Sequence, residues 1–248
     1  MPNEKKYYIA SCSCGKDSMA MVLRLIEENK PLNEIVFYDT GMEFQAIYDN
    51  WERLRNYAEI KGIHCTKLQP QCPFLYTMFE KPVNVGKPNE HKGYSWCGGC
   101  CRWGTTAKLQ ALDTYCQAKN AMCYVGIAAD ETERLIKERK PYKLFPLADW
   151  GMTESNCITF CRGSGVNWQE GGIDLYDILD RVSCWCCANK NQWELYNIWR
   201  CLPTYWERLK DLQSKTDRPF KKEYSVFDLE IRFENGFVPK RRKRQFKL

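Results

Sequence analysis

The sequence lacks a long apolar run, and nowhere does it approach the roughly 18 consecutive apolar residues needed to cross a bilayer. Its first six residues, Met-Pro-Asn-Glu-Lys-Lys, are polar, so the pattern of an export signal is also missing. We therefore expect a cytoplasmic protein with no membrane partner. Disorder is excluded too, because 44% of the 248 residues are hydrophobic and 14% are aromatic, enough for one principal domain with appendages.

Histidine is nearly absent, whereas cysteine is abundant. His64 and His91 stand against 15 cysteines. We expect both histidines to be incidental to function, with His91 the better functional candidate of the two. In a secreted protein this many cysteines would predict disulfides. Without an export signal, and with cysteines in tight groups, metal ligation or redox chemistry is favoured instead.

Positive charge is concentrated at the C-terminus. The 37 lysines and arginines exceed the 31 acidic residues by 37 − 31 = 6, and residues 240–247 alone contain six basic side chains. The rest of the chain is thus formally neutral. Such a tail is a candidate for contact with a nucleic-acid backbone, and its alternative is a solvated end that aids solubility.

Short apolar runs alternate with helical patterns through the first half of the chain. Four runs predict strands, at residues 7–11, 34–39, 63–68 and 122–127. Apolar residues at helical spacing predict helices at 19–26, 44–57 and 103–119. This alternation predicts an α/β fold with a Rossmann-like, mostly parallel sheet.

The second half reads as a C-terminal helical subdomain, with helices expected after Thr153 and over residues 191–212. Residues 70–99 are rich in Pro, Gly, Asn and Lys and predict a long loop or lid over the carboxyl edge of the sheet. Apolar residues alternate with charged ones from Phe227 to Phe233, which predicts a late strand. We expect a nucleotide-binding α/β domain, a helical cysteine-containing subdomain, and a late strand with the basic tail, at residues 1–147, 148–225 and 226–248.

A phosphate loop is predicted at residues 11–18, Ser-Cys-Ser-Cys-Gly-Lys-Asp-Ser. The segment lies between the first strand and the first helix, where backbone amides and the helix dipole hold anions. It is not a Walker A loop, because Ala10 stands where that motif needs Gly and Asp17 follows Lys16. A Ser/Gly turn that merely caps the helix is the alternative.

Residues 13–18 resemble the PP-loop, SGGxDS, of the adenine-nucleotide alpha-hydrolase superfamily, with Cys14 in place of a Gly. Members either cleave ATP between its α and β phosphates, adenylating a substrate, or bind a sulfonucleotide there. Residues 39–44, Asp-Thr-Gly-Met-Glu-Phe, resemble the DTGxEF motif of its PAPS reductase family. The resemblance implies the HUP-type form of the Rossmann-like fold and an adenine nucleotide, ATP or a relative, bound by Ser13, Gly15, Lys16, Asp17, Ser18, Asp39, Thr40 and Gly41.

Two later stretches extend the resemblance over roughly residues 7–187. Residues 126–134 resemble the family's third nucleotide element, which adds Gly126 and Arg134 to the expected nucleotide ligands. Family members often carry basic residues where Ala128 and Ala129 stand, so we expect weaker sulfate or phosphate recognition here. Residues 146–150, Pro-Leu-Ala-Asp-Trp, match the family's PLADW-like stretch.

Two C-x-x-C pairs carry the metal prediction: Cys97 with Cys100, and Cys184 with Cys187. Four thiolates suit tetrahedral zinc or an iron–sulfur cluster, and the spacing does not choose between them. The resemblance favours a [4Fe-4S] cluster, because adenylyl sulfate reductases hold one with a Cys-Cys pair and a distant C-x-x-C. We expect four ligands from the set Cys97, Cys100, Cys101, Cys184 and Cys187, with buried, unligated thiols as the alternative.

The remaining cysteines are expected to be core or surface thiols without a role. Cys186 is a bystander between two ligands. The others of this group are Cys65, Cys72, Cys116, Cys123, Cys157, Cys161 and Cys201.

A reductase of the resembled family attacks sulfate with a C-terminal thiolate, written ECGLH, but this chain has no cysteine after Cys201. Superfamily relatives that modify tRNA or DNA with sulfur instead adenylate a nucleic-acid oxygen. The leading expectation is therefore a PP-loop ATP pyrophosphatase or sulfurtransferase-like enzyme that uses a sulfur-donor protein and contacts tRNA or DNA through its tail.

In this scheme Lys16 and Asp17 are the catalytic residues. Lys16 offsets developing charge, and Asp17 binds Mg²⁺ or orders the loop. Two alternatives stay open. One is a sulfonucleotide reductase acting on adenylyl sulfate, and the other is a non-catalytic nucleotide-binding partner protein.

Overall fold

The computed structural model describes residues 6–97 and 101–241, apart from the Trp103 side chain. The chain forms two compact units. The sheet unit comprises residues 1–70 and 103–168, and the helical unit comprises residues 71–102 and 169–248. Residues 71–102 thus group with the second half of the chain, and residues 148–168 group with the sheet.

The sheet unit is built on five strands in the order β3-β2-β1-β6-β7, and each neighbouring pair is parallel. This confirms the predicted Rossmann-like α/β fold with a mostly parallel sheet. The strands are β1 (Tyr7–Ser11), β2 (Glu34–Tyr38), β3 (His64–Leu68), β6 (Ala121–Val125) and β7 (Lys143–Leu144).

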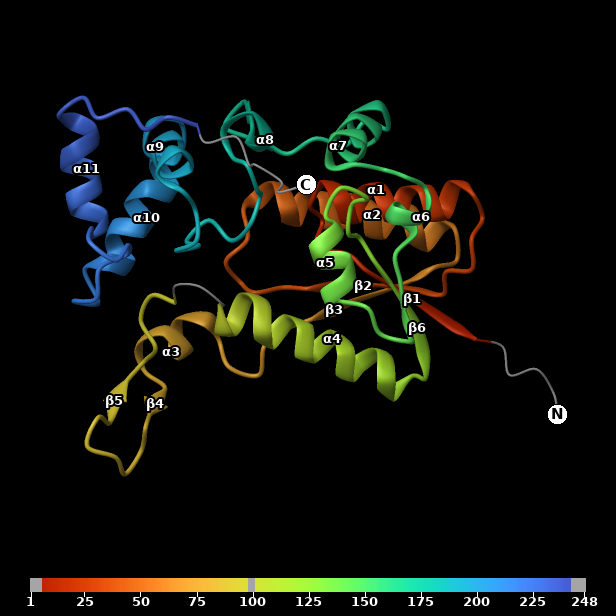
Figure 1. Cartoon of the computed structure of the whole chain (residues 1–248), viewed down its shortest axis with the longest axis horizontal. Helices are drawn as coiled ribbons and strands as arrows, with labels where there is room; N and C mark the ends of the chain where they lie inside the picture. The colour runs from red at the N-terminus through yellow and green to blue at the C-terminus, as the bar shows by residue number, and fades with distance from the viewer. Residues whose placement is uncertain (1–5, 98–100, 242–248) are drawn as a thin grey trace. The chain divides into compact units, whose positions relative to one another are not determined.

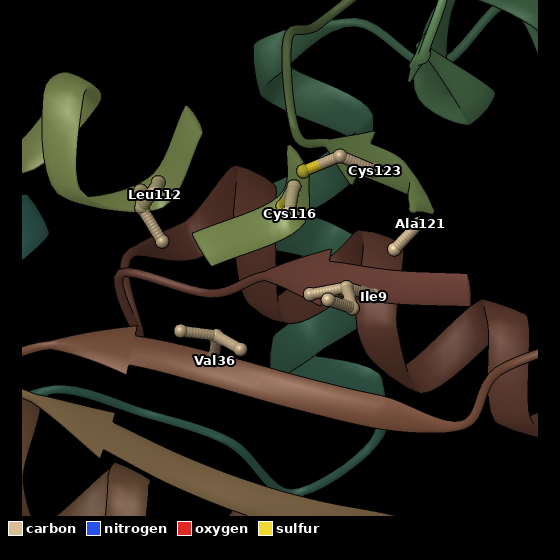
Figure 2. Close-up of a cluster of buried hydrophobic side chains, with 6 residues drawn as sticks. All are labelled: Ile9, Val36, Leu112, Cys116, Ala121 and Cys123. Atoms are coloured by element: carbon tan, nitrogen blue, oxygen red, sulfur yellow. The ribbon is translucent and has the colours of Figure 1, made fainter. Parts of the chain in front are cut away.

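Helices cover both faces of this sheet. Figure 1 shows α1 (Lys16–Glu27) and α2 (Gln45–Ile60) on one face and α4 (Ala107–Ala118) on the other. Figure 2 shows Leu112 and Cys116 of α4 pointing toward Ile9 of β1 and Val36 of β2, with Ala121 and Cys123 of β6 beside them. The remaining helical elements here are η1 (Arg102–Thr106, a π-helical turn before α4), α5 (Thr132–Lys137), α6 (Pro146–Asp149) and α7 (Glu154–Gly163).

The strand β2, which lies between β3 and the central strand β1, is buried along its whole length, which explains its apolar sequence. Its one charged residue, Glu34, is fully buried and accepts hydrogen bonds from Thr66, Tyr115 and Lys119. These donors compensate for the desolvation of the carboxylate and tie β2, β3 and α4 together.

The order of the strands places the loop after β1 at a topological switch point. The chain moves from β1 to β2 and β3 on one side, and returns to β6 and β7 on the other side of β1. In open α/β sheets, ligands bind at the carboxyl ends of the strands where this reversal occurs. The predicted phosphate loop and Gly126, which follows β6, both lie at this point.

The helical unit contains helices and two small hairpins. Residues 70–99, expected to be a loop or lid, include a short helix and a hairpin. The elements are α3 (Phe74–Phe79), β4 (Pro82–Val83), β5 (His91–Lys92), β8 (Gln169–Glu170), β9 (Ile173–Asp174), α8 (Leu175–Ile178), α9 (Gln192–Cys201), α10 (Pro203–Gln213) and α11 (Val226–Glu234).

Two predicted elements of this unit differ in the structure. The helix expected at 191–212 is two helices, because Pro203 cannot donate the hydrogen bond that a continuous helix needs and begins α10 instead. The late strand predicted from Phe227 to Phe233 is wrong, since these residues form α11.

The helix α11 forms because its buried residues follow a helical period. Val226, Leu229 and Phe233 are buried, whereas Phe227 and Ile231 are exposed. Ser225 caps the helix in a capping box with Asp228, a start signal that outweighs the apparent alternation. No helix among the described residues is long and apolar enough to span a bilayer.

Candidate functional site

The phosphate loop has an unusual backbone at Cys14. This residue has a φ of 56°, in the left-handed region that favours glycine, and its side chain is fully buried. Gly15 is extended, with a φ of −80°. The residue that departs from the PP-loop pattern therefore adopts the conformation for which that pattern provides a Gly. Burial raises the pKa of the Cys14 thiol well above its ordinary value.

Trp168 holds the loop at Cys14. The Trp168 indole, itself fully buried, donates a 2.7 Å hydrogen bond from Nε1 to the Cys14 carbonyl oxygen. The contact joins residues 154 positions apart in the sequence. It gives the Cys14 carbonyl a side-chain donor from a distant part of the chain.

Ser18 fixes the start of α1 from inside the loop. Its Oγ accepts a hydrogen bond from the Ser13 amide at 3.1 Å and donates to the Gly15 carbonyl at 3.1 Å, with Ser13 Oγ also at 3.1 Å. Gly15 is the N-cap and has no side chain with which to cap the first amides of α1. A helix start of this kind is a common binding site for phosphate.

Gly126 packs directly against the first turn of α1. A Cβ on this residue would lie 2.9 Å from Ser18 Cα, 3.0 Å from Ser18 N and 3.2 Å from the Asp17 carbonyl carbon. Real Cβ atoms essentially never approach as closely as the first of these distances, and the other two are tighter than nearly all real Cβ contacts. The close approach of β6 to the loop therefore requires glycine at this position.

The Lys16 ammonium is shared by two carboxylates. It lies 2.7 Å from Asp17 Oδ1 and 2.9 Å from Glu154 Oε2, and its side chain is 10% exposed. Burial alone would lower the pKa of Lys16, but Asp17 and Glu154 outweigh burial and raise it. Burial raises the pKa of Asp17 despite Lys16, and Glu154 and Glu131 raise it further.

The Asp39-Thr40-Gly41 turn follows β2 and is organised by its own residues. Asp39 Oδ1 accepts from the Gly41 amide and from the Tyr48 hydroxyl, each at 2.8 Å. Thr40 donates to Glu43 at 2.9 Å, and Gly41 has a φ of 77°. The predicted residues thus form a preformed turn at the end of the strand beside β1.

Arg134 takes part in a local ion pair. Its guanidinium lies 3.1 Å from Glu131 Oε2, and the Arg134 side chain is half exposed. Glu131 is buried and close enough to Asp17 to influence its pKa. Arg134 is therefore paired with a buried carboxylate that also influences Asp17.

Three residues missed by the sequence analysis contact the loop and α1: Trp168, Glu154 and Cys161. Cys161 Sγ donates to the Lys16 carbonyl at 3.3 Å, and burial raises the pKa of Cys161 to about 12. Cys161 follows Cys157 by four residues on α7, so both thiols share the helix face that packs on α1. That spacing is the one signal in the sequence for their placement.

The cysteines of the metal prediction lie in the helical unit. Cys97, Cys101, Cys184 and Cys187 are half-buried, whereas Cys186 is buried. The Cys187 amide donates to the Cys184 carbonyl at 3.1 Å and closes the second cysteine turn, residues 184–187. Among residues 6–97 and 101–241, three or more His, Cys, Asp or Glu side chains nowhere converge as a metal site. Cys100 lies outside these residues.

The segment before the first cysteine pair is anchored by Trp96. This buried indole donates to Gln213 Oε1 at 3.2 Å and packs edge-on against Phe220. Gln213 also accepts from the Phe220 and Val226 amides and donates to the Thr216 and Arg218 carbonyls. One buried glutamine therefore connects Trp96, the residue before Cys97, to α10 and α11.

The described start of the basic tail is held on the helical unit. Arg241 lies 3.1 Å from Asp180 and stacks on the Trp193 ring at 4.3 Å. Asp180 Oδ2 also accepts from Asn191 at 2.9 Å. The rest of the tail lies outside the described residues.

Residues 7–169 match the family model described as the phosphoadenosine phosphosulfate reductase domain. Two proteins of Methanocaldococcus jannaschii, the uncharacterized proteins MJ0066 and MJ0973, are similar to the chain. MJ0066 is 24% identical over 222 residues, which are 84% of this chain and 42% of that protein. MJ0973 is 26% identical over 226 residues, which are 86% of this chain and 49% of that protein.

This chain spans less than half the length of each of these relatives. The family match contains the phosphate loop, the Asp39 turn and Gly126, and it ends before the second cysteine turn. It covers well over half of the chain. The protein therefore belongs to the phosphoadenosine phosphosulfate reductase domain family.

Proposed function

We propose that the sheet unit binds ATP or a related adenine nucleotide at the phosphate loop. The observation that best supports this is Gly126, where a side chain would lie 2.9 Å from Ser18 Cα. A bare strand end packed on the start of α1, at the switch point of a parallel sheet, is an arrangement in which helix N-termini bind phosphate. Membership of the family favours an adenine nucleotide as the ligand.

Lys16 and Asp17 are the residues that we assign to the chemistry. The Lys16 ammonium exchanges its carboxylate partners for phosphate oxygens and offsets the charge that develops on them. Ser13, Ser18 and the Gly15 amide donate to the phosphates. Carboxylates such as Asp17 are the ligands that Mg²⁺ prefers, and Mg²⁺, when bound, neutralises part of the triphosphate charge.

The proposed reaction is adenylation followed by sulfur transfer. A substrate oxygen attacks the α phosphorus of ATP, the bond to the bridging oxygen breaks, and pyrophosphate leaves with the bonding electrons. A sulfur nucleophile then displaces AMP from the activated carbon and forms a carbon–sulfur bond. We propose tRNA or DNA as the acceptor and a sulfur-carrying protein as the donor.

We also propose a thiolate metal centre in the helical unit, with Cys101, Cys184, Cys187 and either Cys100 or Cys97 as ligands. The closed C-x-x-C turn suits thiolate ligation by Cys184 and Cys187. Metal binding would have to bring the first cysteine group to this turn, because the described thiols do not converge. The family resemblance favours a [4Fe-4S] cluster over zinc. Iron, sulfide and zinc analysis of protein purified without oxygen decides between them.

Release of pyrophosphate from ATP, with and without tRNA or DNA, tests the enzymatic proposal. Gly126→Ala should abolish both ATP binding and pyrophosphate release. Gly163→Ala is the matched control, because its new methyl group meets nothing within 4 Å. Lys16→Met should bind ATP weakly and release no pyrophosphate. Circular dichroism shows whether Gly126→Ala folds. If it does not, Lys16→Met still tests the proposal.

A nucleotide-binding partner without chemistry is the second candidate. The Cys14 side chain in a glycine conformation and the ion-paired Lys16 favour it. ATP binding without pyrophosphate release under any acceptor would support this candidate. Production of sulfite from adenylyl sulfate and thioredoxin would instead favour a sulfonucleotide reductase and overturn both proposals.

A further inference from the structure

The carboxylate of Glu154 reaches Lys16 from a helix whose backbone is fixed at the loop. Glu154 is the first residue of α7, and a capping box closes the start of this helix. The Glu154 amide donates to Asp130 Oδ1 at 3.0 Å, which ties it to the segment after β6. Further along α7, Cys161 donates to the Lys16 carbonyl oxygen. The position of Glu154 beside the loop is therefore set by contacts other than its ion pair.

Two carboxylates share the ammonium of Lys16. Its Nζ lies 2.7 Å from Asp17 Oδ1 and 2.9 Å from Glu154 Oε2, so the three groups together carry one net negative charge. The side chains of Lys16, Asp17 and Glu154 are only 10%, 23% and 21% exposed. Charges in such a place are screened less by water and salt than charges at the surface. They therefore act on any anion that approaches Lys16.

Glu154 supplies the surplus of negative charge, because Asp17 alone would balance Lys16. The neighbouring Glu131 does not change this balance, since the Arg134 guanidinium pairs with it at 3.1 Å. A triphosphate is strongly anionic, and bringing it to a group of net negative charge costs free energy. A divalent cation offsets that cost, and Mg²⁺ is commonly held by one or two carboxylates together with substrate phosphates. Asp17 in the loop suits this arrangement.

We propose that Glu154 is a specificity-determining residue of the nucleotide site, whose charge favours a triphosphate bound to a divalent cation over the same triphosphate without one. The inference rests on the nucleotide binding proposed above. It assigns a role to a residue outside the phosphate loop, 138 positions from Lys16 in the sequence.

Calorimetric titration with ATP, once with Mg²⁺ and once with EDTA, tests this role without measuring activity. The wild type should bind Mg·ATP more tightly than metal-free ATP. Glu154→Gln keeps an oxygen acceptor for Lys16 but removes the charge, so it should bind metal-free ATP about tenfold more tightly than the wild type does. Its affinity for Mg·ATP should rise by a smaller factor, because this complex carries less negative charge. The ratio of the two affinities should therefore fall.

Two further variants separate the charge of Glu154 from its shape. Glu154→Asp keeps the charge and should keep a ratio close to that of the wild type, whereas a purely structural role would be disturbed by Asp as well as by Gln. Glu138→Gln is the matched control. Glu138 pairs with the buried Lys143 of β7 at 3.1 Å and is 22% exposed, so the substitution removes a similar ion pair from another lysine. Both ATP affinities should be unchanged in it.

The outcomes distinguish this role from the nucleotide site itself. Equal affinity ratios in the wild type and in folded Glu154→Gln would refute the role of Glu154. A wild type that binds metal-free ATP as tightly as Mg·ATP would refute it without any variant. A wild type that binds ATP under neither condition would refute the proposed nucleotide site. Circular dichroism of each variant shows whether it folds.

Discussion

The phosphate loop and the second cysteine turn differ in what holds them in shape. The loop is fixed by distant parts of its own unit, through Trp168 and Gly126, and from within by Ser18. The cysteine turn is closed by one backbone hydrogen bond, and Lys221 holds the chain that leaves it. A ligand that enters a preformed loop loses little affinity to ordering. A metal that joins separate loops instead contributes to folding itself.

The largest expected effect comes from removing a metal ligand. Cys184→Ser should lose the metal and destabilise the helical unit by about 4 kcal/mol, the entropy of closing a loop of roughly eighty residues. Thermal unfolding under anaerobic conditions, with metal analysis of the same samples, measures this effect.

Cys201→Ser is the control, because Cys201 lies outside both cysteine groups. A chelator should reproduce the Cys184→Ser result in the wild type. Unchanged metal content in Cys184→Ser would show that the turn is not a ligand loop, and the contrast with the phosphate loop would then disappear.

The sheet unit was largely predictable from sequence, because buried parallel strands and their helices leave strong apolar periods. The loop was found because it follows such a strand. The residues that hold the loop, Trp168 and Glu154, were not found from the sequence, because each contacts the loop from more than 130 positions away. No local pattern reports a contact of that range.

The helical unit was harder to predict for a physical reason. Residues 226–234 satisfy a strand period and a helix period at once, and the capping box and burial decide in favour of the helix. Residues 71–102 belong with the distant α10 through the hydrogen bond between Trp96 and Gln213, which composition alone does not reveal.

The next effect tests whether the loop is held from a distance. Trp168→Phe keeps the packing but removes the donor to the buried Cys14 carbonyl, which should cost about 1–3 kcal/mol of unfolding free energy. ATP affinity should fall as well, because the left-handed turn at Cys14 loses its support. Trp150→Phe is the control, since Trp150 contacts Arg24 through its ring face, which Phe retains. Equal ATP affinity in all three proteins would show that the loop does not depend on Trp168.

A smaller effect concerns the charge of Asp17. Because burial raises the pKa of Asp17 in the folded protein, the ionised carboxylate is disfavoured by folding. The penalty is absent below the ordinary pKa of about 3.9, grows as pH rises from there to the raised value, and is constant above it. Asp17→Asn should therefore match the wild type near pH 3 and be more stable than the wild type at pH 7.

The same substitution should abolish Mg²⁺-dependent ATP binding. A gain of stability together with a loss of binding is expected of a residue that is kept for function at the expense of stability.

Asp113→Asn should behave in the opposite way. Burial opposes ionisation of Asp113, but the hydrogen bond from Lys140 prevails and lowers its pKa, so the stability it contributes is present at neutral pH and lost in acid. Urea unfolding at several pH values compares the three proteins. A wild type that gains stability over Asp17→Asn with rising pH would contradict the assignment.

The smallest effect concerns the basic tail, which we expect to contact the backbone of tRNA or DNA. Deleting residues 239–248 removes the six basic side chains of the tail. It should flatten the log–log salt dependence of binding by about 4, at roughly 0.7 for each phosphate of a single strand.

Asp180→Asn should act in the opposite direction. It releases Arg241 from an ion pair that is half exposed and therefore weak, so one more charge becomes available to phosphate.

We expect Asp180→Asn to raise nucleic-acid affinity by a few-fold at low salt and to steepen the salt dependence by about 0.7, with ATP affinity unchanged in both variants. Asp211→Asn, which removes an exposed partner of Lys215 on the same unit, controls for the general loss of one negative charge. Fluorescence anisotropy of labelled tRNA and DNA over a range of salt concentrations measures both slopes. If the deletion and Asp180→Asn both give the same log–log salt slope as Asp211→Asn, the tail is a solvated end. A nucleic-acid acceptor then loses its main electrostatic support.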